Sequence, residues 1–271
     1  MNAENEFEEN DGDQYEESGV VCLPNGVKSE KHGWLRYLNL REMGGTEEEI
    51  LIRKQYSRDG STMRRLLAST VVGIGPTERD VGMIESRDEI EKIVAGMRNS
   101  DAIYSLLRLR LLSEDDPTFR YRLKCPHCEA MTSYRVDLQD HIDKNTEFRP
   151  DTEAPQTSYE AVYRGSTYVY RPLMLSDSAE LAMTQRTDPH MILTAQLACS
   201  IVTIDGKKLP AMSDVSALPK RARTWLRSQI NKCDYGTNVE VLNTCSQCSA
   251  EFKSKLPITS LDFFFPEANS D

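Results

Sequence analysis

Two short stretches of sequence, Cys125-Pro-His-Cys128 and Cys245-Ser-Gln-Cys248, decide the fold of this chain. Each is a pair of cysteines separated by two residues, and each lies between segments that predict β-strands. Such a pair at the tip of a hairpin forms a zinc knuckle, and two knuckles supply the four thiolates of a closed tetrahedral site. We predict one structural zinc ion per chain, bound by Cys125, Cys128, Cys245 and Cys248.

The flanking strands are predicted at 119–123, 133–138, 239–242 and 252–256. A closed four-sulfur site leaves no open position for water or substrate, so the predicted zinc is structural. The alternatives for the cysteines are a disulfide or unmetallated pair, or a redox pair. His127 lies inside the first pair, but with four cysteines available it is not expected to bind the metal.

Composition limits the classes of function. The chain has 271 residues, 39% of them hydrophobic, which is enough for one large domain or two small ones. Its net charge of −10 disfavours binding to the phosphate backbone of nucleic acids. A membrane span needs a run of about 18 apolar residues, and none is present. The first residues lack the pattern of a signal peptide, so secretion is not expected.

Seven cysteines are an odd number, and four of them have zinc spacing, which fits a reducing cytoplasm. Cys199 lies in an apolar run and is predicted to be a small core residue. Cys22 and Cys233 receive no role.

Residues 1–20 are predicted to be a disordered acidic tail. Eight of the first 18 residues are Asp or Glu, and only Phe7 and Tyr15 are aromatic. Such a segment buries too little apolar area to fold alone. It is either a solvated tail or a segment that folds on a basic partner surface.

The ordered chain is predicted to begin at Gly33 with a strand over 34–40. Thr46 is expected to cap a helix that begins with three glutamates, and Asp101 to cap a helix with an apolar side. Further helices are predicted over 61–68 and 87–97, and a strand or buried segment over 67–74.

The two parts of the chain show weak similarity, which predicts an internal duplication with α+β halves at 33–142 and 158–266 and a linker at 143–157. The alternative is that such short apolar matches occur by chance. Each half would contain a strand, helices and a zinc knuckle, and the shared zinc would join the halves. Four matches support this prediction, namely 35–40 with 170–175, 67–74 with 197–204, Ala102 and Leu106 with Ala222 and Leu226, and the two cysteine pairs.

No catalytic constellation is visible in the sequence, so we expect no enzymatic activity, catalytic residue or small-molecule substrate. Arg108, Arg110, Arg120 and Arg122 form a basic strip, which is either a solvated face or a contact surface for an acidic partner.

Near the chain end, Phe263, Phe264 and Phe265 cannot all face one core from a strand or helix. They either pack onto the chain's own knuckle or insert into a neighbouring subunit. We predict a subunit contact at these three residues.

The motifs that carry a family resemblance follow one another in a fixed order. They are Arg36-x-Leu38-x-Leu40 before acidic residues, Asp101-Ala-Ile-Tyr-Ser-Leu-Leu-Arg-Leu-Arg110 before the first knuckle, and a second half that ends in the second knuckle and Asp262-Phe-Phe-Phe-Pro266. Over residues 33–266 this arrangement resembles the baseplate hub and hub-assembly proteins of contractile-tailed phages of the T-even kind. The cysteines vary within that family, so the zinc prediction depends on the spacing in this chain alone.

The resemblance implies a non-enzymatic virion structural protein or assembly factor. Its partners would be other baseplate, hub or tail-tube proteins, in the host cytoplasm during assembly and in the baseplate of the virion. The alternative is a zinc-ribbon module that binds nucleic acid or a transcription complex, although such modules use basic, aromatic-studded faces.

Overall fold

The computed structural model describes residues 19–84, 86–208, 212–258 and 261–265. These residues form a mixed α+β fold, as predicted. The predicted acidic tail, residues 1–20, lies outside the described residues except for Gly19 and Val20, and Pro266 lies outside them as well.

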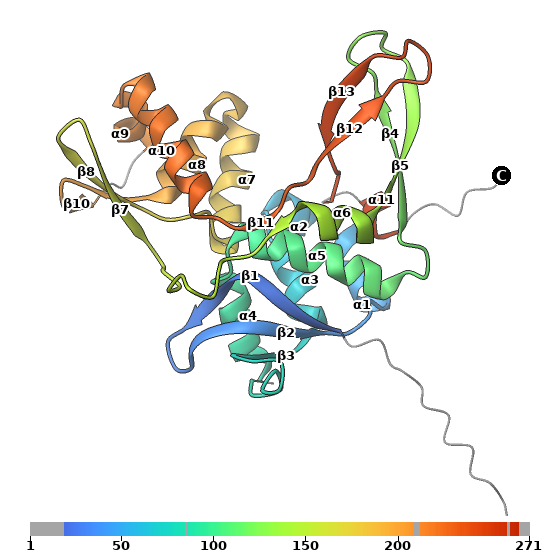
Figure 1. Ribbon diagram of the computed structural model, residues 1–271, viewed down its shortest axis with the longest axis horizontal. Helices are drawn as coiled ribbons and strands as arrows, with labels where there is room; N and C mark the ends of the chain where they lie inside the picture. Colours follow the sequence, from blue (N-terminus) through green and yellow to red (C-terminus); the bar gives the residue numbers. More distant parts are fainter. Residues whose placement is uncertain (1–18, 85, 209–211, 259–260, 266–271) are drawn as a thin grey trace, which may run out of the picture.

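A three-stranded antiparallel sheet in the order β1-β2-β3 opens the fold (Figure 1). Its strands are β1 (Val20–Ser29), β2 (Gly33–Leu40) and β3 (Val71–Gly75). Strand β1 corrects the prediction that order begins at Gly33. The turn-forming residues Pro24, Asn25 and Gly26 interrupt the apolar alternation, and the structure places a register shift between Cys22 and Val27.

Helices pack beside this sheet in much the predicted places. They are α1 (Gly45–Ile52), α2 (Lys54–Arg58), α3 (Thr62–Thr70), α4 (Arg87–Ala95) and α5 (Asn99–Ser113). The N-cap of α1 is Gly44 and not Thr46, and Asp101 lies inside the first turn of α5 instead of capping it.

A second sheet, in the order β10-β9-β8-β7, forms a separate lobe with its own helices (Figure 1). Its strands are β7 (Tyr159–Tyr163), β8 (Ser166–Tyr170), β9 (Ile201–Ile204) and β10 (Lys207–Lys208). The helices are α7 (Ser178–Thr187), α8 (Ile192–Ser200), α9 (Met212–Ala217) and α10 (Lys220–Lys232), with short 3-10 turns at Leu175–Asp177 and Pro189–Met191.

Two hairpins project together from the body of the protein (Figure 1). The first is β4 (Thr118–Lys124) with β5 (Met131–Asp137), and the second is β12 (Glu240–Thr244) with β13 (Glu251–Lys255). The remaining elements are α6 (Leu138–Asn145), the pair β6 (Thr146–Glu147) and β11 (Gly236–Thr237), and α11 (Leu261–Phe264).

Segment 143–157, predicted as a linker, is packed onto the body. Strand β6 pairs with β11, and Arg149 is only 8% exposed. The backbone N–H of Arg149 donates to the carbonyl of Pro24 at 2.9 Å. The segment therefore connects the two parts of the chain while making fixed contacts with the first sheet.

The two sheet-containing parts share a bidentate ion pair at the same place. Arg41 donates to both carboxylate oxygens of Glu47 at 3.1 and 2.8 Å, and Arg171 donates to both oxygens of Asp177 at 2.8 Å each. Each residue of the second pair follows its counterpart by 130 positions. Such bidentate, charge-assisted bonds are stronger and more specific in geometry than single hydrogen bonds.

The backbone around these ion pairs repeats at the same spacing. The N–H of Arg41 donates to the carbonyl of Thr70 at 2.9 Å, and the N–H of Arg171 donates to the carbonyl of Ser200 at 2.8 Å. Helices α3 and α8 end at these two carbonyl residues, and strands β3 and β9 follow directly.

The strand registers also correspond at a spacing of 130. Leu38 pairs with Ile74 and Tyr168 with Ile204, and both strand pairs have an irregularity one residue later. The match of 67–74 with 197–204 agrees with this spacing. The match of 35–40 with 170–175 is wrong, because β8 ends at Tyr170, the counterpart of the last residue of β2.

Buried side chains form two clusters. The larger lies under the first sheet and extends through α5 into the hairpins, and the smaller lies under the second sheet. Ala102 and Leu106 of α5 are buried in the first cluster region, and Ala222 and Leu226 of α10 are buried in the second lobe. These two pairs, matched in the sequence, thus occupy core positions on helices.

Arg98, at the start of α5, connects the two lobes. Its guanidinium donates to the side-chain oxygen of Asn25 at 2.9 Å, to the carbonyl of Cys233 at 2.6 Å and to the hydroxyl of Tyr159 at 3.1 Å. Arg98 is only 4% exposed. A buried charge that serves both lobes fixes their relative position, because losing any partner leaves it unsatisfied.

Asp101 is a second buried charge at this junction. Its Oδ1 accepts the backbone N–H of Asn25 at 2.8 Å, whereas its Oδ2 is buried without a hydrogen-bond partner among the described residues. Burial raises the pKa of Asp101 to about 7. Burial also raises the pKa of Asp234, which accepts a bond from Ser100 at 2.6 Å.

The raised pKa of Asp101 predicts a pH-dependent stability. The unfolded-state pKa of Asp is about 3.9, so stability present at low pH is lost as the pH rises from about 4 through about 7. Between pH 5 and 8, the free energy of unfolding of the natural chain should fall by about 3 kcal/mol more than that of Asp101→Asn. Urea titrations at both pH values measure this difference. If the free energy of unfolding falls by the same amount between pH 5 and 8 in both proteins, the prediction is contradicted.

Candidate metal centre

The two cysteine pairs lie at the tips of the two projecting hairpins. Cys125 follows β4, and its backbone N–H donates to the carbonyl of Ala130 at 2.9 Å. Cys245 follows β12, and its N–H donates to the carbonyl of Ala250 at 3.0 Å. These bonds close each tip into a tight turn and direct both cysteines of a pair toward the same side.

The turn after each pair uses the same backbone conformation. Glu129 has φ 61° and Ser249 has φ 57°, which are left-handed values uncommon in residues other than glycine. Such values reverse the chain just after the second cysteine, so that Ala130 and Ala250 return to accept the N–H groups of Cys125 and Cys245. The two tips are therefore built alike, at a spacing of 120 residues.

The structure brings all four predicted ligands together. Their sulfur atoms lie within 4.8 Å of one another, with Cys125 Sγ 3.8 Å from Cys248 Sγ and Cys128 Sγ 3.7 Å from Cys245 Sγ. Four sulfurs at about 2.3 Å from a tetrahedral zinc lie about 3.8 Å apart, so the set fits one metal ion. The cysteines are free thiols, and a disulfide needs sulfurs at about 2.05 Å.

Backbone N–H groups favour thiolates at this site. The N–H groups of Cys248 and Gln247 donate to the sulfur of Cys245 and lower its pKa to about 6. The pKa of Cys248 is instead raised to about 12, because desolvation and hydrogen bonds with the other three cysteines outweigh the N–H of Ala250. The N–H of His127 donates to Cys125 Sγ at 3.4 Å. Since a metal binds the thiolate and not the thiol, the donors to Cys245 prepare that sulfur for coordination. His127 contributes a backbone N–H and has an exposed side chain.

A buried hydrogen bond between the hairpins holds the two pairs in reach of each other. The hydroxyl of Tyr121 on β4 donates to Asn243 Oδ1 on β12 at 2.8 Å, and Asn243 Nδ2 donates to Ser254 Oγ at 2.9 Å. The rings of Tyr134 and Phe252 meet edge to face with centroids 5.9 Å apart. Asn243 was not predicted. The available signal in the sequence was strand alternation, which places Asn243 on the same face of β12 as the apolar Val241.

The other three cysteines lie apart from this cluster. Burial raises the pKa of Cys199 to about 12 and that of Cys233 to about 11, which keeps both as neutral thiols. Cys22 and Cys199 are half-buried. Cys199 was predicted to be a core residue, but it lies only partly inside the core.

The aromatic chain end packs onto the first hairpin. Phe263 and Phe264 are 0% and 2% exposed, and the ring of Phe263 meets Phe119 of β4 edge to face at 5.0 Å. The predicted subunit contact is therefore corrected for these two residues, because α11 turns both rings into the chain's own core. Phe265 is half-buried and packs against the same core.

Arg110 was predicted to belong to a basic strip, but the structure buries it. It is 2% exposed, and its guanidinium lies 5.4 Å from the ring centroids of Phe119 and Phe263. A desolvated cation over two rings stabilises their arrangement. Arg110 therefore links α5 to the base of the first hairpin and to α11. Its place on the apolar side of α5 was the signal for this role.

Comparison of the chain with protein-family models, with curated protein sequences and with solved structures found no match. Within the described ranges, no helix combines the length and the apolar character that crossing a bilayer requires.

One metal ion per chain is the first expectation from this geometry. Replacing half of the set, Cys245→Ser with Cys248→Ser, should abolish stoichiometric metal and destabilise the fold, because a closed thiolate site contributes its binding energy to folding. Elemental analysis of the purified protein measures the ratio. The control, Cys199→Ser, should retain one equivalent. Two equivalents in the natural chain, or full retention in the double variant, would show that the knuckles do not share a metal.

The packing of Phe263 gives a second expectation. Phe263→Ala should lower the free energy of unfolding by about 3–5 kcal/mol, because it empties a fully buried ring position. The control, Leu242→Ala on β12, removes a side chain that is 65% exposed and should change stability by less than about 0.5 kcal/mol. Chemical unfolding measures both. Unchanged stability of Phe263→Ala would favour a segment that is free to engage a partner.

Proposed function

We propose that the chain is a non-enzymatic structural or assembly component of a contractile phage tail baseplate hub, as the family resemblance implies. The observation that carries the proposal is the shared cysteine set, which joins two hairpins 120 residues apart and has no ligand position for substrate. Such a site would hold the two hairpins together, which suits a protein that docks on other subunits.

We further propose that the metal is zinc and that the two halves arose by internal duplication. Zinc fits four thiolates without geometric penalty, and the sulfur distances of 3.7 and 3.8 Å suit it. The duplication is supported by the ion pairs and strand registers that repeat at 130 residues and by the knuckle turns that repeat at 120. The second copy is shorter between its sheet (β7 to β10) and its knuckle.

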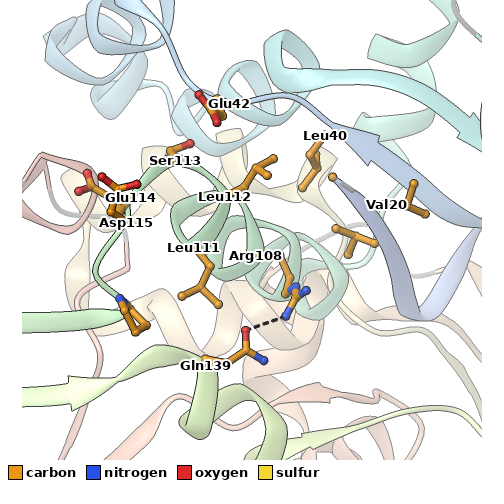
Figure 2. Close-up of a pocket in the computed structure, with 13 residues that line it drawn as sticks. Val20, Leu40, Glu42, Arg108, Leu111, Leu112, Ser113, Glu114, Asp115 and Gln139 are labelled. Carbon is orange, nitrogen blue, oxygen red and sulfur yellow. Dashed lines mark hydrogen bonds between the residues drawn. The ribbon is translucent and has the colours of Figure 1, made fainter. Parts of the chain in front are cut away.

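One cavity at the surface of the described residues suits a docking role. It measures about 740 Å³ and lies where α5 ends beside β1 (Figure 2). Its lining mixes the apolar Leu111 and Leu112 with the carboxylates of Glu42 and Glu114. Arg108 points to Gln139 and donates to its Oε1 at 3.2 Å (Figure 2). This mixture offers a docking recess for a polar segment.

A nucleic-acid-binding zinc module is the second candidate, because of where the negative charge lies. Residues 1–18 hold eight acidic and no basic residues, so the other residues carry 35 acidic and 33 basic side chains, a net charge of −2. The net charge of −10 is therefore a poor argument against nucleic-acid binding, because most of it lies in residues 1–18 and the first hairpin carries exposed arginines.

Mass spectrometry of purified phage particles and of their assembly intermediates tests the proposal. The chain should occur at a fixed ratio to tail proteins in one or both. The variant Cys245→Ser with Cys248→Ser should fail to enter them, whereas Cys199→Ser should enter normally. Absence from both kinds of particle, together with salt-sensitive DNA retention in a filter-binding assay, would favour the nucleic-acid module.

A further inference from the structure

The outer face of the first hairpin is a basic surface. Strand alternation turns Phe119 and Tyr121 inward and leaves Arg120 and Arg122 exposed on β4. Arg135 is exposed on β5, directly across from Arg120 in the antiparallel register. Three arginines thus share one face of a two-stranded sheet. We call Arg120, Arg122 and Arg135 the arginine face.

The charge of the arginine face is not balanced locally. Like charges directly opposite each other across strands destabilise a sheet. Within the part of the chain that the structure describes, no carboxylate lies within ion-pair distance of these three residues. Asp116 comes near Arg120, but its Oδ1 already accepts the backbone N–H of Thr118 at 2.8 Å. The face therefore favours an anionic occupant.

The hairpin holds the arginine face rigidly. Its inner side is buried against Phe263 and Asn243, and its tip carries half of the metal site. A fixed basic surface binds an anionic segment without the entropic cost of ordering the hairpin itself.

A complementary segment belongs to the same chain. Residues 1–18 contain eight acidic residues and no Lys, Arg or His. Opposite charges attract without a specific fit between side chains, so a sequence of this composition suits the contact.

The attachment point of this segment places it within reach. Gly19 and Pro117 line the same cavity, and β4 begins at the next residue, Thr118. The seven residues of β4 span about 23 Å, whereas 18 extended residues reach about 60 Å. The tether is thus long enough to lay several carboxylates along the whole face.

We propose that the acidic segment 1–18 binds the arginine face of its own chain and shields it from other anions. The segment then acts as an intramolecular competitor, so an acidic protein surface or a nucleic acid must displace it before reaching the hairpin. This inference is independent of the proposed baseplate role, because it needs only the charges and the tether.

Zero-length carbodiimide cross-linking of the full-length protein tests the proposal, because it joins a carboxylate to a lysine in direct contact. Lys124 is exposed at the end of β4 and should form cross-links with acidic residues of 1–18. Its cross-link with Glu129, whose carboxylate lies 3.0 Å away, is an internal standard for a folded hairpin. Mass spectrometry identifies both products.

The triple variant Arg120→Glu, Arg122→Glu, Arg135→Glu should lower the yield of tail-to-Lys124 cross-links at least about fivefold and leave the Lys124–Glu129 product in place. High salt should also lower the yield of tail-to-Lys124 cross-links, because raising the ionic strength from about 10 mM to about 1 M shortens the Debye length from about 30 Å to about 3 Å. The control, Lys207→Glu with Lys208→Glu on β10, should leave the tail-to-Lys124 yield unchanged.

Three outcomes would overturn the proposal. The first is an unchanged tail-to-Lys124 yield in the triple variant while the Lys124–Glu129 product persists. The second is cross-linking mainly between isotopically labelled and unlabelled copies at low protein concentration, which would make a second chain the occupant. The third is the absence of tail cross-links in the natural protein. If the triple variant then also loses retention of single-stranded DNA, the arginine face belongs to nucleic acid.

Discussion

Contact between two hairpins that are far apart in sequence is the constraint on which the rest of the fold depends. Cys128 and Cys245 are separated by 116 residues, and closing so long a loop costs entropy that grows only slowly with length. The bond from Tyr121 to Asn243 and the four sulfurs oppose that cost at one place. Because a metal ion would need thiolates from both hairpins, neither hairpin can complete the site alone, and metal binding would couple the folding of the two hairpins.

The same constraint explains which parts of the fold could be predicted. The cysteine spacing identified the four sulfurs that the structure brings together, because two half-sites with a fixed local geometry are visible in sequence. Helical periodicity located α3, α4 and α5 to within a few residues. Strand β1 was not predicted, because Pro24 and Gly26 are typical of turns and only the tertiary environment makes them part of a strand.

Long-range packing explains the remaining differences. Three adjacent phenylalanines looked like a partner surface, but α11 places Phe263 and Phe264 against β4, which no local pattern shows. Arg110 looked like a surface charge, whereas the two rings beside it make a buried position tolerable. The sequence match of 35–40 with 170–175 has a spacing of 135, because short apolar motifs recur, whereas the hydrogen-bonded strand registers correspond at a spacing of 130.

Helix α5 connects the base of the first hairpin to the second lobe. At its C-terminal end, Arg110 contacts the rings at the base of the first hairpin. At its N-terminal end, Arg98 and Ser100 bond to Cys233 and Asp234, which follow α10. Helix α5 therefore carries a buried arginine at each end, Arg98 and Arg110. Each has neighbours in a different part of the chain, and a buried charge that loses its partners is strongly destabilising, so the two contacts tie the first hairpin and the second lobe to one helix.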